Sequence, residues 1–407
     1  MLFDSSPEVV QESATRHHPR DAQLRANFCG VDVAIRTDSP SYFEPFRRLY
    51  RRFLTAPSVA TPPTNVLTVH LVTCPDTWLN TGFDWTCPGL AIDGRRVYFP
   101  DPWLVRSYVY EQIIEHALAR TTTCLPVHGA ALTLGQRTLL LVGAGGRGKT
   151  TLALGLLQNG ALFLGDDIGQ LAWPPSPTHG LRVDPFLRSL RIRPDTFVRL
   201  GWRHSFSSAD RWQGSYLVDV TRLPLGGPHT GEVDSAAVGE GAPLDILFLL
   251  ENESASASSD LRLLLDGAAT PVSRALARNP HVSAIRTQVV DGLLVVTLTT
   301  DAPRRVGRTV RALCREHATP LLDMRPTSAE ERLFAPTPSV VPVTPGVAAM
   351  TLLEHAFGTQ ALHRDTGSSV ARLSRALARV ACYRLQVGPP VATCGLIEEL
   401  AAQPVPA

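Results

Sequence analysis

The chain has 407 residues and a net charge of +2, from 39 basic and 37 acidic residues. This near balance excludes a polybasic surface as the main feature, so we expect no nucleic-acid partner and no membrane partner. Hydrophobic residues make up 44% of the chain, and no apolar run approaches the roughly 20 residues that a membrane helix requires. Thirty-eight of the 39 basic residues are arginine, and Lys149 is the single lysine.

The termini and the cysteines point to a cytoplasmic protein. Residues 1–26 are polar and acidic, unlike a secretory signal peptide, and we expect a disordered lead-in there. The seven cysteines are odd in number and contain no CxxC pair, so neither a disulfide framework nor a zinc site is predicted.

Residues 27–125 have the pattern of an α+β domain. Strands are predicted where β-branched residues alternate or run together, and helices where apolar residues recur at helical spacing. Asp101 followed by Pro102 is typical of a helix start. The predicted strands are 31–35 and 66–72, and the predicted helices are 43–54 and 102–119.

From residue 127 the pattern changes to strand, glycine-rich turn, helix and strand, which predicts an α/β layer with a mainly parallel sheet. We assign this domain to residues 126–334. A proline-rich linker (335–346) and a mostly helical C-terminal segment (347–407) are expected to follow it. Within the domain, the predicted strands are 127–133, 137–142, 244–250 and 293–298, and the predicted helices are 149–158, 270–278 and 303–317.

The turn at 143–150 matches G-x-x-x-x-G-K-[ST] in full and lies between an apolar strand and a helix, as a phosphate-binding loop does. Glycines let backbone N–H groups turn toward phosphate oxygens, and the helix N-terminus favours negative charge. The predicted nucleotide-binding residues are Gly143, Gly145, Gly146, Arg147, Gly148, Lys149, Thr150 and Thr151.

Lys149 is expected to bind the β- and γ-phosphates of ATP, and the Thr150 hydroxyl is expected to contact Mg²⁺. Arginine occupies every other basic position in the chain. A lysine kept only in this loop therefore indicates a site that needs a compact ammonium rather than a planar guanidinium.

Two adjacent carboxylates, Asp166 and Asp167, follow the next predicted strand, 17 positions after Lys149. Beside a magnesium nucleotide, one could hold the metal while the other accepts a proton from an attacking hydroxyl. His128 precedes Lys149 by 21 positions. From its position alone, His128 is either a core residue with satisfied hydrogen bonds or a member of the site.

Residues 127–167, VHGAALTL followed by LLLVGAGGRGKTTLALGLLQNGALFLGDD, resemble the core of the HPr kinase/phosphorylase family. The resemblance implies a P-loop kinase fold related to phosphoenolpyruvate carboxykinase, with ATP and Mg²⁺ as cofactors and a homo-oligomeric state. It implies Asp166 as general base toward a serine hydroxyl, Asp167 and Thr150 near Mg²⁺, and His128 near the γ-phosphate. Residues 126–334 would form this HPr-kinase-like domain.

The chain resembles divergent members of that family. The acidic, arginine and glycine signature that recognises HPr is absent, and Gly145 stands where bacterial HPr kinases usually carry serine. The overall layout is similar to HPr-kinase-like proteins found near peptide natural-product clusters, whose relatives phosphorylate a serine of a lasso-peptide precursor.

The sequence therefore predicts a phosphotransferase that moves the γ-phosphoryl group of ATP to a hydroxyl, with serine of a peptide or protein as the expected acceptor. Two alternatives stay open: a kinase for a small hydroxylated metabolite, and a non-catalytic protein that binds a partner when nucleotide is bound. Arg188, Arg191 and Arg193 could clamp a phosphate or an acidic peptide, or could be solvated strand residues.

Overall fold

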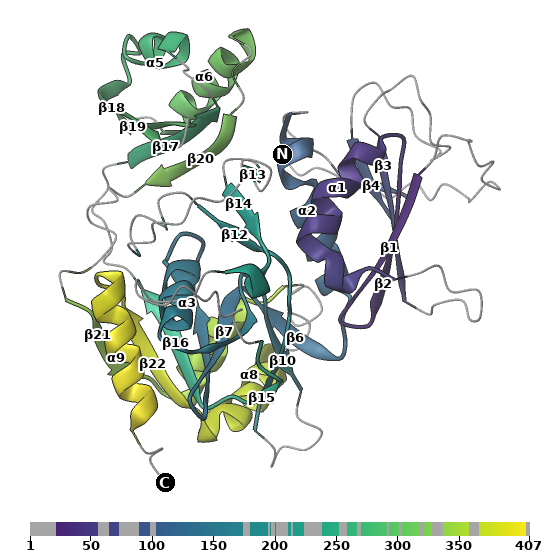
Figure 1. Ribbon diagram of the computed structural model, residues 1–407, viewed down its shortest axis with the longest axis vertical. Helices are drawn as coiled ribbons and strands as arrows, with labels where there is room; N and C mark the ends of the chain where they lie inside the picture. The colour runs from purple at the N-terminus through teal and green to yellow at the C-terminus, as the bar shows by residue number, and fades with distance from the viewer. Residues whose placement is uncertain are drawn as a thin grey trace. The chain divides into compact units, whose positions relative to one another are not determined.

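The computed structural model divides into two compact units, Met1–Thr123 and Cys124–Ala407, shown in Figure 1. None of the described helices is long and apolar enough to cross a bilayer. The structure describes residues 22–55, 65–72, 89–97, 103–173, 180–193, 196, 200, 211–212, 215–223, 238–251, 259–266, 270–290, 293–300, 303–317, 319, 321–327, 335, 337–357 and 366–403.

The first unit is a five-stranded sheet, in the order β1-β2-β3-β4-β5, with two helices. Its first strand begins at Ala22, so the expected disordered lead-in of 1–26 is too long. Leu24, Ala26 and Phe28 are buried on alternate positions, as in a strand with one face on a core. The elements are β1 Ala22–Phe28, β2 Val31–Thr37, η1 Pro40–Tyr42, α1 Phe43–Tyr50, η2 Arg51–Phe53, β3 Val66–Val72, β4 Gly89–Ile92, β5 Arg95–Val97 and α2 Trp103–Leu118.

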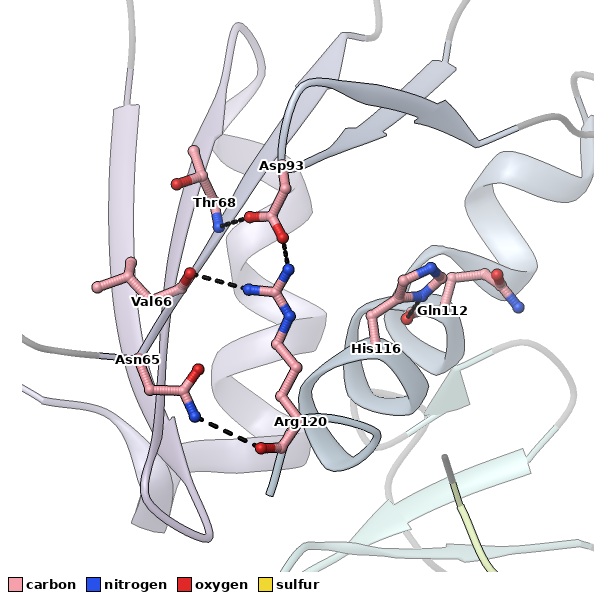
Figure 2. A network of polar contacts seen from close by, with 7 residues as sticks. All are labelled: Asn65, Val66, Thr68, Asp93, Gln112, His116 and Arg120. Atoms are coloured by element: carbon pink, nitrogen blue, oxygen red, sulfur yellow. Dashed lines mark hydrogen bonds and ion pairs between the residues drawn. The ribbon is translucent and has the colours of Figure 1, made fainter. Parts of the chain in front are cut away.

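Aromatic rings and one arginine hold this unit together. The ring of Phe28 meets those of Phe46 and Tyr50 edge to face, with centroids 6.2 and 5.3 Å apart. Figure 2 shows the polar part, in which the Arg120 guanidinium just beyond α2 points at Asp93 and at the carbonyl of Val66. These contacts fix the end of α2 to the sheet.

The second unit is built on a six-stranded sheet in the order β21-β22-β16-β8-β7-β9. Only β22, β16 and β8 run parallel, and the other three pairings are antiparallel. The sheet is therefore mixed rather than mainly parallel. Gly135, with a φ of 58°, lies in the tight hairpin that makes β7 antiparallel to β8. The strands are β7 Gly129–Leu134, β8 Arg137–Val142, β9 Leu162–Gly165, β16 Ile246–Glu251, β21 Ser339–Pro342 and β22 Ala381–Gln386.

Both faces of this sheet are covered. Leu139 and Leu141 pack with α3 and α9 on one face, and Leu140 and Val142 pack with α7 and α8 on the other. The helices α3 and α9 lie so close that a Cβ on Gly155 would stand 2.8 Å from the Cys394 sulfur. The helices are α3 Lys149–Gln158, α7 Pro345–Glu354, α8 Thr366–Ala376 and α9 Pro390–Ala402, with the short η7 Leu377–Arg379 after α8.

Two small sheets complete this core, in the orders β15-β11-β10-β6 and β12-β14-β13. Their elements are β6 Cys124–Val127, β10 Gly169–Ala172, β11 Arg182–Asp184, β12 Leu190–Ile192, β13 Arg211–Trp212, β14 Ser215–Val218, η4 Val220–Arg222 and β15 Ala242–Pro243.

The segment expected as linker and helical tail is part of this core. Strand β21 lies within the predicted linker 335–346, and β22 lies within the segment 347–407, where it runs parallel to β16 in the main sheet. Cys382 and Leu385, three positions apart on β22, are buried on opposite faces of that sheet. The Ala- and Leu-rich composition of the segment indicated helices only, so the strand among its three helices was not predicted.

Residues 259–327, between β16 and β21 in the chain, form an insert with its own core. Its element order βαββαβ and its strand order β18-β19-β17-β20 are those of the ferredoxin-like motif. Three buried leucines of β17 alternate along the strand and pack on the helices. The elements are β17 Ser259–Asp266, α5 Thr270–Leu276, β18 Val282–Val290, β19 Leu293–Thr300, α6 Pro303–Glu316 and β20 Leu321–Thr327.

Candidate functional site

The glycine-rich loop joins the end of β8 to the start of α3. Gly146 and Gly148 have φ of 80° and 90°, a backbone conformation that only glycine adopts readily. A Cβ on Gly143 would come within 3.1 Å of the Leu250 carbonyl oxygen, whereas a Cβ on Gly145 would meet nothing within 4 Å. The backbone therefore favours glycine at 146 and 148, a side chain at 143 would crowd Leu250, and position 145 has room for a side chain.

Lys149, the first residue of α3, is only 4% exposed. Its Nζ donates hydrogen bonds to the carbonyl oxygens of Gly143 (2.7 Å) and Ala144 (2.9 Å), so the ammonium spans the loop. Burial lowers the pKa of Lys149, and the carboxylates of Asp167 and Asp166 oppose this shift. A compact cation is thus held inside the loop where phosphates are expected.

Asp166 follows the last residue of β9 and is 1% exposed. The Thr150 hydroxyl donates a hydrogen bond to its Oδ2 at 2.8 Å. Its other oxygen, Oδ1, is buried and has no hydrogen-bond partner among the described residues. Burial, followed by the negative charge of Asp167, raises the pKa of Asp166 to about 7. A carboxyl with this pKa can take up or release a proton near neutral pH.

Asp167 adopts a left-handed backbone conformation with a φ of 63°. Arg188 donates a hydrogen bond to its Oδ2. Arg188 is positioned because Phe186 bridges to Gly165 at the end of β9 and its N–H donates to the Leu164 carbonyl (2.8 Å). Burial is the largest single effect and works to raise the pKa of Asp167, but the charges of Arg188, His128, Lys149 and Arg191 together lower it.

His128 lies between β6 and β7, and its Nδ1 is 3.0 Å from the carbonyl oxygen of Asp167. A carbonyl oxygen can only accept, so Nδ1 carries the proton in this contact. Burial, together with the charge of Lys149, lowers the pKa of His128 to about 4. The imidazole is therefore neutral at pH 7, and its Nε2 is a hydrogen-bond acceptor.

The structure brings Lys149, Thr150, Asp166, Asp167 and His128 together around the loop. The remaining predicted nucleotide-binding side chains are less involved. Thr151 is 9% exposed in the first turn of α3, and Arg147 is partly exposed.

The three arginines of 186–194 are not on one strand, because β12 covers only Leu190–Ile192. Arg188 lies before that strand and donates a hydrogen bond to Asp167. Arg191 lies within the strand, and its positive charge contributes to the lowered pKa of Asp167.

Sequence reasoning missed the segment after α7. The His355 carbonyl accepts from the His128 N–H (2.7 Å), and the Phe357 N–H donates to the Pro126 carbonyl (2.9 Å). The ring of Phe357 meets the His128 ring edge to face. Burial, then the charge of Lys149, lowers the pKa of His355, which places this imidazole in the field of the loop. No motif or spacing in the sequence marks residues so far from the loop.

The residues present fit a bound Mg²⁺–nucleotide. The buried Oδ1 of Asp166 lacks a partner within the described chain, and the neighbouring Thr150 hydroxyl is a hard oxygen ligand of the kind that Mg²⁺ prefers. The two aspartates differ in this respect. The Oδ2 of Asp167, predicted to lie near the metal, is directed at Arg188, whereas Asp166 is the carboxylate in contact with Thr150.

No model of a known protein family matches the chain. None of the curated proteins matches it either. Among solved structures, it is similar to the HPr(Ser) kinase/phosphatase from Coxiella burnetii, with 16% sequence identity and a TM-score of 0.21. The match covers 47% of this chain and 95% of that chain.

Proposed function

We propose that this chain is a kinase that transfers the γ-phosphoryl group of ATP to a hydroxyl. The observation that carries the proposal is the buried Asp166 carboxyl, in contact with Thr150 of the phosphate-binding loop. Nucleotide binding alone requires the loop and its lysine, but not a carboxyl with a pKa near 7 beside them. The order of residues in 127–167, which resembles HPr kinases, supports the same reaction.

Each group has a role in this reaction. Asp166 removes the proton of the acceptor hydroxyl. The acceptor oxygen then forms a bond to the γ-phosphorus, and the bond between that phosphorus and the bridging oxygen breaks to release ADP. Lys149 binds the phosphates, and the Thr150 hydroxyl would hold Mg²⁺, which would neutralise phosphate charge. His128 and Arg188 position Asp167, whose negative charge keeps the pKa of Asp166 high.

The acceptor that we propose is serine in a peptide or protein, including a precursor peptide of the lasso type. This part rests on the family resemblance of 127–167 and on the absence of the HPr-recognition signature from the sequence. A panel of serine peptides, free serine and hydroxylated metabolites, each incubated with γ-labelled ATP and Mg²⁺, would rank the acceptor classes. Label transfer to metabolites alone would exclude a peptide acceptor.

The test of the catalytic assignment is Asp166→Asn. We expect transfer of label from ATP to fall by about 10²–10⁴-fold, because general-base catalysis typically contributes that factor. Binding of a fluorescent ATP analogue should persist, since Lys149 and the loop are unchanged. Asp184→Asn, which alters a carboxylate of β11 outside the site, is the matched control. If Asp166→Asn transfers phosphate at the parent rate, Asp166 is not the base.

Thermal unfolding separates loss of chemistry from loss of fold. The pKa of Asp166 is raised in the folded protein from the ordinary 3.8 to about 7. The folded state therefore binds more protons over this range, and stability declines as the pH rises from about 4 to about 7. Asparagine has no charge to bury, so Asp166→Asn should be at least as stable as the parent at pH 8. If Asp166→Asn is less stable than the parent at pH 8, the pKa of Asp166 is not raised in the folded protein.

A further inference from the structure

Within the described residues, the sheet of the insert 259–327 ends at strand β18. Strand β18 is the last strand of its sheet and pairs only with β19 among the described strands. It is nine residues long, and its one irregularity lies at its start, between Val282 and Ala284. An edge strand of this length is a template for strand addition by another chain, unless its sequence or shape protects it.

Proline and lysine, two of the usual protections of an edge strand, are missing from the middle of β18, and proline is present at the opposite edge. Between Ala284 and Val290 the strand contains neither proline nor lysine. The exposed fraction of Val289 is 67%. The opposite edge strand, β20, contains Pro326, and its pairing with β17 is broken at Leu264 and Leu265. The insert therefore offers β18, rather than β20, for strand addition.

The charge of the insert is strongly positive. Residues 259–327 contain ten arginines against six carboxylates, a net charge of +4, in a chain whose net charge is +2. The rest of the chain is therefore net negative, at −2. Such a local excess attracts acidic partners to this part of the molecule.

Arginines also lie in register across the sheet. Arg286 of β18 pairs with Thr297 of β19, Thr297 pairs with Arg262 of β17, and Arg262 pairs with Arg325 of β20. Residues directly across a sheet share a face. Leu261 and Leu263, which flank Arg262, pack toward the helices, so Arg262 and Arg286 belong to the opposite face, where Arg262 is buried. Arg286, at the middle of β18, is exposed.

Pairing of β18 with a second copy of itself is disfavoured. An antiparallel pair centred on the strand would place Arg286 directly opposite Arg286 of the second copy. Like charges directly opposite each other destabilise a sheet, and a shifted register would reduce the number of paired residues. A strand that carries carboxylates would instead meet the arginine with opposite charge.

We propose that the edge of β18 is a docking site for an extended acidic peptide segment, which adds to the sheet as a further strand and places a carboxylate beside Arg286. That this segment belongs to the acceptor rests on the proposed function. Docking through an insert outside the kinase core would let the enzyme select its acceptor by a sequence away from the phosphorylated hydroxyl.

The test uses the full chain and two fluorescein-labelled nine-residue probes, one alternating valine with glutamate and one alternating valine with lysine. Fluorescence anisotropy, without nucleotide, should show that the glutamate probe binds and the lysine probe binds at least ten-fold more weakly. Arg286→Glu should weaken binding of the glutamate probe by about ten-fold or more. Arg274→Glu makes the same charge change on α5 and should change binding less than two-fold.

A second variant tests the backbone contribution. Gln288→Pro removes an N–H from the strand, and a glutamate probe N-methylated at alternate residues removes donors from the peptide. Both should abolish binding, while circular dichroism and the melting temperature report on the fold. If Gln288→Pro unfolds the protein, the N-methylated probe gives the same information with the unaltered chain.

The proposal is overturned if Arg286→Glu or N-methylation leaves binding unchanged, or if both probes bind equally. It is also overturned if the protein self-associates through β18, seen as a dimer by sedimentation that Arg286→Glu alters. A kinase assay with a short serine peptide that lacks an acidic segment keeps the two proposals apart. Phosphoryl transfer without probe binding would exclude the docking site and leave the kinase proposal intact. Probe binding without phosphoryl transfer to any acceptor would exclude the kinase proposal and leave the docking site intact.

Discussion

Two arginine–aspartate pairs in this molecule use the same chemistry for different ends. Arg120 bonds Asp93 in the first unit, and Arg188 bonds Asp167 in the second. Both aspartates have a positive φ, 47° for Asp93 and 63° for Asp167. The side chain of Arg120 is 37% exposed, whereas that of Arg188 is 10% exposed.

The difference lies in what surrounds each pair. Asp93 and Gly94 form the tight turn between β4 and β5, where a positive φ is ordinary, and Asp93 also accepts from the Thr68 N–H (2.9 Å). Arg120 joins the Asp93 carboxylate to the Val66 carbonyl of a neighbouring strand (Figure 2). Asp167 instead adjoins a buried carboxyl with an orphan oxygen. The first pair connects elements of a sheet, and the second lies beside a buried carboxyl whose pKa it affects.

The largest expected effect comes from Lys149→Arg. The Nζ of Lys149 fits between two carbonyl oxygens at 2.7 and 2.9 Å, in a position 4% exposed, where a planar guanidinium is too large. We expect the rate of phosphoryl transfer to fall by about 10³-fold or more, which is the typical loss when a protein cation that contacts the transferred phosphate is removed. Steady-state transfer with γ-labelled ATP measures it. Near-parent activity would mean that the single lysine is there by chance.

This residue also shows what the sequence could predict. The loop, its lysine and the paired aspartates are local in sequence, and a glycine-rich turn between strand and helix has a fixed geometry. Arg188 and His355 are not local, and the parallel pairing of β16 with β22 brings together residues separated by the whole insert. Strand pairing across such distances depends on tertiary burial, which the apolar pattern of 381–386 alone does not specify.

The next largest effect is expected for Arg188→Met, which keeps the aliphatic volume and removes the charge. Asp167 then loses its cation while Asp166 stays close, so we expect a loss of about 1–3 kcal/mol in the free energy of unfolding. Chemical denaturation measures it. The double variant Arg188→Met with Asp167→Asn should recover part of the loss. If it recovers nothing, the arginine stabilises the fold by packing rather than by its charge.

A smaller effect is expected in the pH dependence of Asp167→Asn. The charge of Asp167 contributes to the raised pKa of Asp166, after burial. Asparagine removes this like charge, so the pKa of Asp166 should fall. The acidic limb of the kcat/KM profile, which reports the free enzyme, should move to lower pH by about one unit. Asp184→Asn should leave the limb in place. A limb that stays or moves upward would show that Asp167 does not tune the base.

The smallest effect is expected for Arg120→Lys, the reverse of the exchange at Lys149. A lysine can reach either Asp93 or the Val66 carbonyl, which the Arg120 guanidinium contacts together (3.0 Å to the carbonyl). Because the pair is partly exposed, we expect a loss of about 0.2–1 kcal/mol in stability and unchanged phosphoryl transfer. Thermal unfolding and the labelled-ATP assay measure the two quantities. A loss of transfer without a loss of stability would give the first unit a part in the reaction, and the distinction between a structural pair and a catalytic one would then fail.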